Sequence, residues 1–508
     1  MPKKVIIIGA GIGGLATANL LAKAGYDVHV YEKNAQLGGR AGQRTTNGFT
    51  FDTGPSWYLM PKVFEQYFSL FDVDLNHELG IKKLTPAYKV FFESHEAMTI
   101  HGDVDKDAAQ FEAVEKGSGE RLKTYVKEGQ EIYDMAIEHF LYTNFERPQE
   151  LADKRILAAG GRMAKLLLTN IHSRVSTFVT AKPLQQILEY PMVFLGTSPF
   201  KAPAMYSLMS ALDFNEGVFY PARGMYSIID ALVGIGKAHG VTYHVNAPVT
   251  SITHADGTAS GIVVGGASIA GDIIVSNADL HFTETALLNA SARSYPDTFW
   301  KKKESGISAL LLYIGVKGAL PQLEHHNLFF VDKWRENFEA IYESKEVPES
   351  ASLYVSRTSA TDPTTAPEGH ENLFVLAPLP SGISLNDTDT KVLTQRFLKQ
   401  VADAISEPEL TDRIVTLETF GPDDFKDSYN SWNGTALGMS HLLKQSAFWR
   451  IPNKSKKLKN LYYVGATTVP GIGLPMCLIG AELTYKRIVG IKKGGPVTSI
   501  ETPEGETK

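Results

Sequence analysis

The sequence predicts an α/β protein: a Rossmann-like domain assembled from separated segments, joined to an α+β domain with a mixed sheet. Two observations predict it. An apolar, β-branched run at Val5–Ile8 leads directly into a glycine cluster and a helical stretch. Further short strand patterns recur at residues 239–279 and 460–465, separated by long stretches of mixed helical and strand periodicity. Distant segments are therefore expected to share one parallel sheet.

The first element is a strand at Val5–Ile8, whose apolarity on both faces is typical of a buried parallel strand. Gly9, Gly11 and Gly14 then match the pattern G-x-G-x-x-G, with Gly13 inside it. In such a motif the first glycine permits a tight turn, the second lets the backbone approach a pyrophosphate, and the third lets the helix pack on the strand. We therefore expect these four glycines at a nucleotide phosphate site.

A helix is expected over Leu15–Ala24, with its N-terminus directed at the phosphates, where its dipole favours anions. Gly25 ends this helix, and Asp27–Tyr31 forms a second strand that is followed by Glu32. An acidic residue about 20 positions after the glycines can hydrogen-bond the ribose hydroxyls of a dinucleotide. The alternative is an ordinary glycine-rich turn, but strand, glycines, helix, strand and acid together favour a nucleotide site.

The loop after Glu32 indicates which dinucleotide binds, FAD or NAD. Gly39 and Arg40 belong to a Gly-Gly-Arg sequence that can place backbone amides and a guanidinium against the pyrophosphate; a surface arginine is the alternative. Gly54 lies in the sequence Phe49–Pro55 that follows. Together these stretches resemble the flavin amine oxidase and carotenoid desaturase superfamily. The resemblance implies an extended FAD at this loop. No second glycine motif follows a strand, so no separate nicotinamide domain is expected.

The remaining strand patterns divide the chain. Residues 239–245, 248–252 and 271–279 are typical of further strands of the nucleotide-binding fold, and Val249 in the second of them is expected at the cofactor. The FAD-binding domain is thereby assigned to residues 1–75, 216–284 and 451–492. The substrate domain is assigned to residues 76–215 and 285–450, and a flexible tail to residues 493–508, which are rich in Pro, Thr, Glu and Gly.

The C-terminal stretch narrows the resemblance. Asn460–Ile488 is similar to the C-terminal signature of bacterial phytoene desaturases and their dehydrosqualene desaturase relatives. In that family a strand ends in Val-Gly, and a Pro-Gly-x-Gly-x-Pro loop then enters a helix; here these are Val464–Gly465 and Pro470–Pro475. The amides of such a helix can stabilise negative charge on the reduced flavin ring. The resemblance implies four flavin contacts: Gly465, Gly473, Leu474 and Pro475.

Three earlier stretches resemble the same family: Phe51–Ser56, Gln185–Tyr206 and Gly217–Met225. In the last of them Arg223 replaces the first of two paired glycines, which puts the local turn in question but not the family. The resemblance extends from Lys4 to about Gly490. It implies FAD-dependent dehydrogenation of a linear polyisoprene, phytoene or the shorter dehydrosqualene, in carotenoid biosynthesis.

The sequence identifies no catalytic residue. It contains no Ser-His-Asp order, no Cys/His cluster with metal-ligand spacing and no obvious carboxylate dyad. His325, His326 and His441 are interpreted as surface histidines or as histidines with satisfied hydrogen bonds. Catalysis is expected to depend on FAD placement and on a long apolar channel. Six side chains are candidates for its lining, with plain core packing as the alternative: Trp57, Tyr58, Met60, Met192, Phe194 and Trp432.

Composition limits the location and the partners. The formal net charge of −6 argues against nucleic acid as a partner. The single cysteine, Cys477, excludes an internal disulfide and suits a reducing compartment. No stretch is long and apolar enough to span a membrane. We expect a cytoplasmic protein on the inner face of the cell membrane, with an apolar carotenoid precursor as substrate. The sequence does not identify the electron acceptor, for which oxygen and a quinone are both open.

The expected membrane contact is a leucine-rich stretch at Ile156–Val175. An amphipathic helix on the membrane surface and a solvated helix of the substrate domain both explain the pattern, and Gly160–Gly161 weakens any helix there. Five basic residues punctuate the stretch: Lys154, Arg155, Arg162, Lys165 and Arg174.

The residues leave other functions open. One alternative is a different flavin enzyme, such as an amine or protoporphyrinogen oxidase, or a carotene isomerase that uses reduced FAD. Another is a non-catalytic FAD-binding escort protein. Amine oxidases need an aromatic cage beside the flavin, whereas the C-terminal loop here offers Val469, Ile472 and Leu474.

Overall fold

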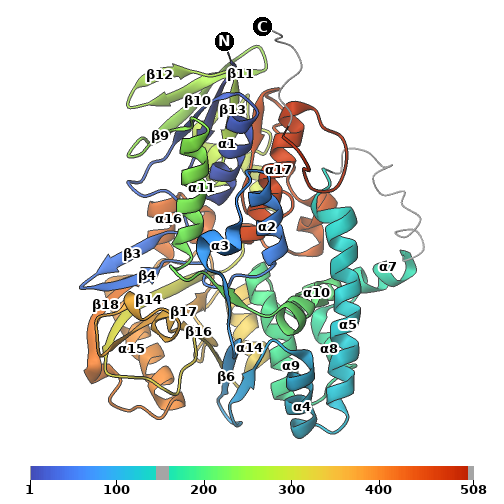
Figure 1. Ribbon diagram of the computed structural model, residues 1–508, viewed down its shortest axis with the longest axis vertical. Helices are drawn as coiled ribbons and strands as arrows, with labels where there is room; N and C mark the ends of the chain where they lie inside the picture. Colours follow the sequence, from blue (N-terminus) through green and yellow to red (C-terminus); the bar gives the residue numbers. More distant parts are fainter. Residues whose placement is uncertain (1, 145–159, 501–508) are drawn as a thin grey trace.

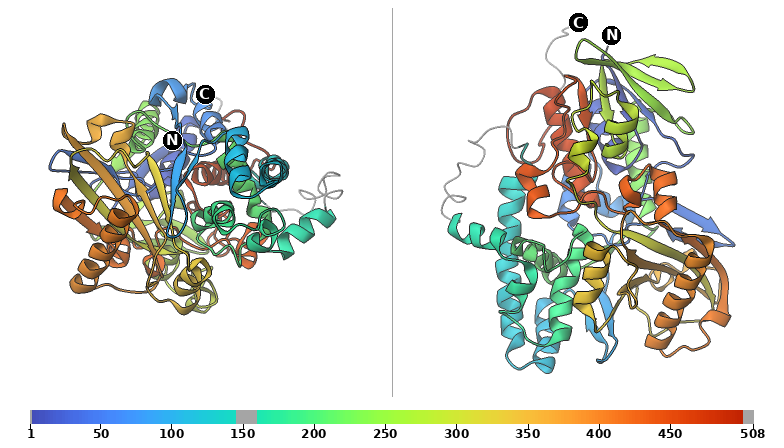
Figure 2. Two further views of the ribbon diagram at one scale, coloured as in Figure 1. Left: turned by 90° about the horizontal axis from the view of Figure 1, so that it is seen from below. Right: turned by 180° about the vertical axis from the view of Figure 1, so that it is seen from behind.

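The computed structural model describes residues 2–144 and 160–500. Figure 1 shows a sheet with covering helices near the two termini, and below it a second sheet beside a group of helices. The rear view in Figure 2 shows the same division, with the long helix α5 (Ser118–Ala136) running along the helical side. Among the described residues, no helix is long and apolar enough to cross a bilayer.

The upper sheet is a parallel sheet built from three separated segments. Its strand order is β19-β13-β1-β2-β9, and every neighbouring pair is parallel. The central strand β1 is buried on both faces from Val5 to Ile8, as its continuous apolar run predicts. The expected Rossmann-like α/β fold is confirmed. Its strands are β1 (Lys4–Ile8), β2 (Asp27–Tyr31), β9 (Thr242–His244), β13 (Ile273–Ser276) and β19 (Leu461–Tyr463).

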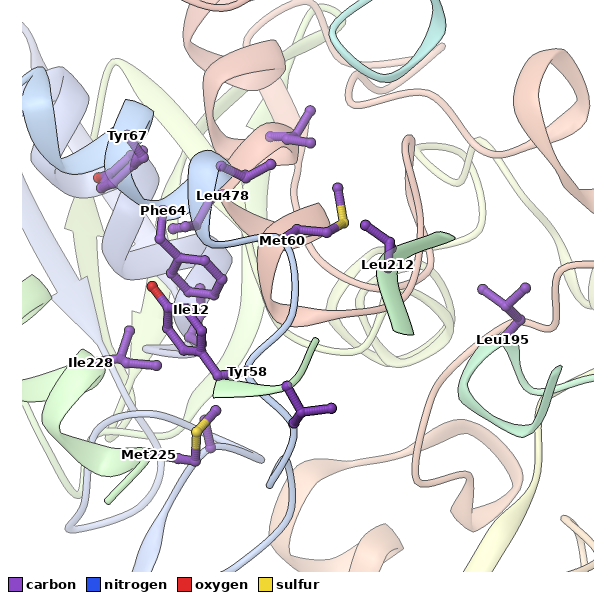
Figure 3. Packing of buried hydrophobic residues seen from close by; sticks show 14 of the residues in the cluster. Ile12, Tyr58, Met60, Phe64, Tyr67, Leu195, Leu212, Met225, Ile228 and Leu478 are labelled. Carbon is purple, nitrogen blue, oxygen red and sulfur yellow. The ribbon is translucent and has the colours of Figure 1, made fainter. Parts of the chain in front are cut away.

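Four helices pack around this sheet: α1 (Ile12–Lys23), α2 (Pro61–Ser69), α11 (Tyr226–Ala238) and α17 (Leu474–Val489). Helix α1 begins three residues earlier than expected, because the last glycines of the motif form its first turn. The Tyr67 hydroxyl donates to the Ala16 carbonyl at 2.8 Å and joins α2 to α1. Figure 3 shows Phe64 and Tyr58 stacked in this core, while Met60 and Leu212 lie together nearby.

Residues 249–270 leave the parallel sheet and form an antiparallel meander. The strand expected at 248–252 is present, but it pairs with its own successor rather than with β1 or β2. The cause is the Asp256–Gly257 turn, in which both residues have positive φ and reverse the chain. The strands are β10 (Val249–Ala255), β11 (Thr258–Val264) and β12 (Ala267–Ala270).

The lower sheet is mixed, with strand order β18-β14-β17-β16-β15-β6-β7. Only the β15–β6 pair is parallel. Helix α15 (Asp387–Ala404) covers one face through Phe397 and Val401, which share an apolar cluster with the sheet. The strands are β6 (Tyr88–Phe92), β7 (Met98–Ile100), β14 (Ser308–Lys317), β15 (His326–Phe330), β16 (Leu353–Ser356), β17 (His370–Leu379) and β18 (Ile414–Phe420).

Shorter elements complete the fold. The helical side contains α4 (Val104–Val114), α7 (Gly160–Leu168), α8 (Ile171–Val175), α9 (Lys182–Glu189), η3 (Tyr190–Leu195), η4 (Ala204–Ser207) and α10 (Leu208–Ala211). Elsewhere lie β3 (Gln43–Thr46), β4 (Phe49–Asp52), α3 (Leu75–Leu79), β5 (Lys82–Lys83), β8 (Phe219–Tyr220), α12 (Leu280–Phe282), α13 (Asp297–Trp300), α14 (Trp334–Glu339), α16 (Pro422–Tyr429) and η13 (Ala447–Trp449).

The expected helix over Ile156–Val175 is wrong as a single element. Residues 154–159 lie outside the described residues, and the remainder forms two helices, α7 and α8. The side chain of Asn170 accepts the Ser173 amide and starts α8 anew, which is the N-cap role that asparagine favours. Arg174 donates to Glu128 at 2.5 Å and is engaged inside the protein.

Part of the expected flexible tail is held in place. The Val497 amide donates to Glu482 on α17 at 2.6 Å, and Gln66 on α2 donates to the Val497 carbonyl at 2.8 Å. Val497 is buried. Val497 is therefore held on two helices, contrary to the expectation of a flexible tail, because a local composition rich in Pro and Gly does not reveal a docking surface elsewhere in the chain. Residues 501–508 lie outside the described residues. The other domain boundaries stay a prediction.

Candidate active site

A continuous cavity of about 1090 Å³ runs from the carboxyl ends of β1 and β2 past the N-terminus of α17 to the helical side. It exceeds the usual range of about 300–1,000 Å³ for small-molecule sites. Twelve of the thirteen residues predicted to bind the cofactor line it: Gly9, Gly11, Gly13, Glu32, Gly39, Arg40, Gly54, Val249, Gly465, Gly473, Leu474 and Pro475. Gly14 is not among its lining residues.

The glycine motif places the N-terminus of α1 at this cavity. Gly11 is its N-cap, and no described side chain caps the helix, so its first amides face the cavity as free donors. A Cβ atom on Gly14 would lie 2.3 Å from the carbonyl oxygen of Gly9. Gly14 therefore lets the helix pack on the strand, which explains why it does not line the cavity.

Glu32 lies at the end of β2 with both carboxylate oxygens engaged. Its Oε2 accepts the Ala10 amide at 2.8 Å, and its Oε1 accepts the Asn34 amide at 2.9 Å. These two bonds fix the carboxylate at the cavity wall. Each oxygen retains a second lone pair, so the carboxylate can still accept bonds from ribose hydroxyls.

Arg40 is half-buried in the cavity wall, which excludes the surface arginine considered as the alternative. Its Nη2 donates to Ser431 Oγ at 2.5 Å and to the Thr435 carbonyl at 3.3 Å. Its Nε is buried without a partner among the described residues. A buried, unpaired guanidinium nitrogen beside uncapped helix amides suits an anionic group.

The second helix terminus at the cavity belongs to α17. Gly473, with φ of 120°, is its N-cap, no described side chain caps it, and Pro475 lies in its first turn. Arg450, which the sequence did not single out, braces the segment before this helix. It donates to the carbonyls of Ala466 at 2.5 Å and Thr468 at 3.0 Å. No local motif marks Arg450, because its partners are backbone carbonyls.

Asn277 and Asp279 were also missed, although both line the cavity. They follow β13 directly, at the carboxyl edge of the parallel sheet where ligands bind in this fold. The Asn277 side chain donates to the Val464 carbonyl at 2.9 Å. Polar residues just after a predicted strand were the signal that could have identified them.

The cavity is built for an extended dinucleotide. The uncapped terminus of α1 and the free Arg40 nitrogen suit a pyrophosphate, Glu32 suits a ribose, and the uncapped terminus of α17 suits a flavin edge that becomes negative on reduction. Fold and site together define an FAD-dependent oxidoreductase. Residues 12–483 match the family of flavin containing amine oxidoreductases, and the chain belongs to that family.

Similar proteins refine this assignment. The chain is 39% identical to the carotenoid 3,4-desaturase of Haloarcula japonica over 485 residues, which cover 96% of this chain and 98% of the relative. It is 33% identical to the zeta-carotene-forming phytoene desaturase of Myxococcus xanthus, with 96% and 94% coverage. Putrescine oxidase bound to putrescine shares the fold, with a TM-score of 0.61 at 14% identity, covering 97% of this chain and 100% of that one.

The section of the cavity beyond α17 is apolar. Of the six predicted channel residues, Trp57, Met60 and Phe194 line it. Tyr58, Met192 and Trp432 are buried in the core and are not lining residues, so their prediction was wrong. Aromatic and methionine side chains serve both environments, and only the packing separates them. The lining includes Ile132, Phe140, Leu167, Met205, Leu208 and Leu443.

The three histidines singled out from the sequence are all buried, so the surface interpretation is wrong. His325 Nδ1 lies 2.7 Å from Thr361 Oγ1, and His326 Nδ1 lies 2.8 Å from the Tyr354 hydroxyl. His441 lines the cavity. Burial lowers the pKa of all three rings below the ordinary value, so they are neutral at physiological pH.

FAD is expected to be tightly but non-covalently bound. Cys477 lines the cavity, yet burial raises the pKa of its thiol to about 11, and a protonated thiol is a poor nucleophile toward a flavin. When the denatured protein is filtered, the yellow flavin should pass through the filter while the polypeptide is retained. Flavin that stays with the denatured chain would contradict this prediction.

Proposed function

We propose that the chain is an FAD-dependent carotenoid desaturase that dehydrogenates phytoene, dehydrosqualene or a related linear polyisoprene. The names of the relatives, a carotenoid 3,4-desaturase and a zeta-carotene-forming phytoene desaturase, support an oxidoreductase acting on CH–CH groups. The proposed FAD contacts are the twelve predicted residues that line the cavity, while Gly14 supports the site through helix–strand packing.

The observation that carries this proposal is the continuity of the two sections of the cavity. The same cavity is lined by the cofactor-site residues, by the Gly473 loop and by an apolar group that includes the exposed Phe448 and Trp449. A long hydrocarbon fits such a channel, because its recognition requires buried apolar contact rather than polar pairing. A porphyrin would leave its carboxylates unpaired there.

The chain's own residues position the substrate, shield it and stabilise negative charge at the cofactor. Bound FAD supplies the hydride acceptor. The apolar walls hold a section of the polyisoprene beside the 470–475 loop and exclude water. The free amides at the start of α17 favour negative charge at the cofactor. The neutral His441 is not required as a base, because positive charge in a polyene is delocalised and the adjacent C–H bond becomes acidic.

Product analysis tests the proposed function. We expect the protein, expressed in cells that make only phytoene or only dehydrosqualene, to yield coloured extracts with longer conjugated systems. The Gly473→Leu variant serves as the inactive control. Colourless extracts with both precursors, from folded and FAD-loaded protein, would contradict the proposal and favour the isomerase or oxidase alternatives.

We further propose that the cavity mouth rests on the inner face of the cell membrane, from which the insoluble substrate enters. Phe448 and Trp449 line the mouth and are 46% and 57% exposed. Leu168 at the end of α7 is 81% exposed. Exposed Lys165 and Lys444 neighbour these apolar side chains in the sequence and suit anionic headgroups. Figure 1 shows α7 projecting from the helical side.

Replacing both Phe448 and Trp449 with serine is expected to weaken binding to anionic liposomes at least about tenfold, because two large apolar side chains no longer enter the lipid. Liposome flotation measures the bound fraction. The matched control is the double variant Val415→Ser and Leu417→Ser, which removes exposed apolar side chains on β18. Equal flotation of both double variants, or none by the unaltered protein, would contradict the membrane proposal.

A further inference from the structure

Three aromatic rings line one section of the cavity. Trp57 follows β4, Phe194 lies in η3 and Tyr354 lies in β16. The ring centroid of Trp57 is 5.4 Å from that of Phe194 and 6.0 Å from that of Tyr354. We call Trp57, Phe194 and Tyr354 the aromatic section. Its members come from three elements that are far apart in the sequence.

The aromatic section borders the loop at the start of α17. Gly196 lies two residues after Phe194, and a Cβ atom built on it would be 3.7 Å from Ile472 Cδ1. Ile472 belongs to the 470–475 loop and lines the cavity. On the other side, Trp57 directly follows residues 53–56, which also line the cavity. The rings therefore lie at the part of the channel where chemistry is expected.

The two histidine rings behind Trp57 contribute no positive charge. The ring of His326 stacks on the indole with centroids 4.5 Å apart and planes 8° apart. Burial lowers the pKa of His326 well below its ordinary value, and that of the adjacent His325 to about 3. Both imidazoles are therefore neutral, so neither opposes a cation in the cavity.

A buried carboxylate lies in the same layer. Asp213 Oδ2 accepts from the Tyr88 hydroxyl at 2.7 Å and from the Tyr190 hydroxyl at 2.9 Å. The rings of these two tyrosines lie 5.4 Å and 6.2 Å from that of Trp57. Among the described residues, Asp213 Oδ1 has no hydrogen-bond partner, and no lysine or arginine is among the groups that shift its pKa. Burial raises the pKa of Asp213 to about 7, and its negative charge, where present, is balanced only by the two tyrosine hydroxyls.

This arrangement favours positive charge in a channel whose proposed substrate is neutral. Aromatic faces attract cations through their quadrupole, and more strongly where water is excluded. A neutral hydrocarbon gains nothing from that attraction in its ground state. The attraction therefore accelerates a reaction only if positive charge develops on the substrate during it.

Building on the proposed function, we propose that Trp57 is a catalytic residue that stabilises positive charge on the polyisoprene as its hydride departs, with Phe194 and Tyr354 assisting. In this step one C–H bond breaks, and its electron pair leaves with the hydrogen to the flavin, which is reduced. The carbon left behind is electron-deficient and faces the rings. The neighbouring C–H bond then breaks, its electron pair forms the new double bond, and its proton would pass to the reduced flavin, which thereby takes up both hydrogens.

Graded fluorination of Trp57 tests this proposal, because fluorine weakens the ring quadrupole with little change in shape. Tryptophans carrying one to four fluorines are introduced at position 57 of the full-length, FAD-loaded protein. The anaerobic rate of flavin bleaching by phytoene or dehydrosqualene is then measured. We expect the logarithm of the rate to fall steadily with each fluorine, by about threefold to thirtyfold over the series, with unchanged substrate affinity. The same series at Trp300, which is buried and does not line the cavity, should leave the rate unchanged.

A binding measurement separates charge stabilisation from packing. A geranylgeranyl chain ending in trimethylammonium should bind more tightly than its uncharged carbon isostere, and the difference should shrink along the Trp57 series. If the bleaching rate and the binding preference are unchanged along the fluorinated series, with normal FAD content, the role of Trp57 is overturned. The proposed desaturase function would still stand. If the unaltered protein bleaches with neither polyene, the proposed function itself fails and this inference with it.

Discussion

Replacing Gly473 with leucine is expected to reduce desaturation by at least about a hundredfold while FAD remains bound. Gly473 has φ of 120°, a conformation that residues with a side chain avoid, and it starts the helix whose free amides face the flavin position. Leucine would displace the 470–475 loop, and a displacement of about 1 Å at a reacting centre can lower a rate a hundredfold. The rate of flavin bleaching by a polyene under anaerobic conditions measures desaturation. The FAD absorbance of the purified protein measures how much cofactor remains bound.

Gly490→Leu is the matched control for Gly473→Leu. Gly490 ends the same helix, also has positive φ, and has open space around a built Cβ atom. Its replacement introduces backbone strain in α17 without touching the cavity, so the rate per bound FAD should be preserved. If both variants lose activity equally, strain in the helix explains the loss and the loop has no special role. Full activity of Gly473→Leu would remove the loop from the site.

Replacing Glu32 with alanine is expected to weaken FAD binding by about 1–3 kcal/mol, which is roughly fivefold to 150-fold. The variant loses the proposed ribose contact and leaves the amides of Ala10 and Asn34 without their acceptor. Titration of FAD into apoprotein, followed by flavin fluorescence, gives the dissociation constant. Asp27→Ala is the control, because Asp27 lies at the opposite, exposed end of the same strand. An unchanged constant for Glu32→Ala would exclude Glu32 from the site.

The nucleotide half of the site could be predicted because its contacts are short-range in sequence. Gly9 to Glu32 form one strand–helix–strand unit, and the Gly9 carbonyl excludes a side chain at Gly14 five residues later. Cβ atoms on Gly9, Gly11 and Gly13 would instead meet the distant Asn277. The second helix terminus at Gly473 is also local, since loop and helix are contiguous. Such units keep their conformation wherever the rest of the chain lies.

For the substrate half of the site, the sequence predicted an apolar channel but not which residues line it. Phe194 and Met192 are two residues apart, yet one lines the cavity and the other is core. The sequence offers no periodicity to separate them, because η3 is a short helix with no regular apolar stripe. The burial of His326 was missed for a related reason: its partner Tyr354 lies on the neighbouring strand rather than nearby in sequence.

The sequence by itself determined the fold class, the cofactor and the family, because these depend on contiguous motifs whose geometry is set by backbone sterics and helix dipoles. Only the tertiary structure decided which aromatic rings line the channel and which residues surround its mouth at Trp449. It also decided that Arg40 donates a hydrogen bond to Ser431. Those contacts join residues hundreds of positions apart. The same side chain fits core, channel or surface equally well until packing chooses among them.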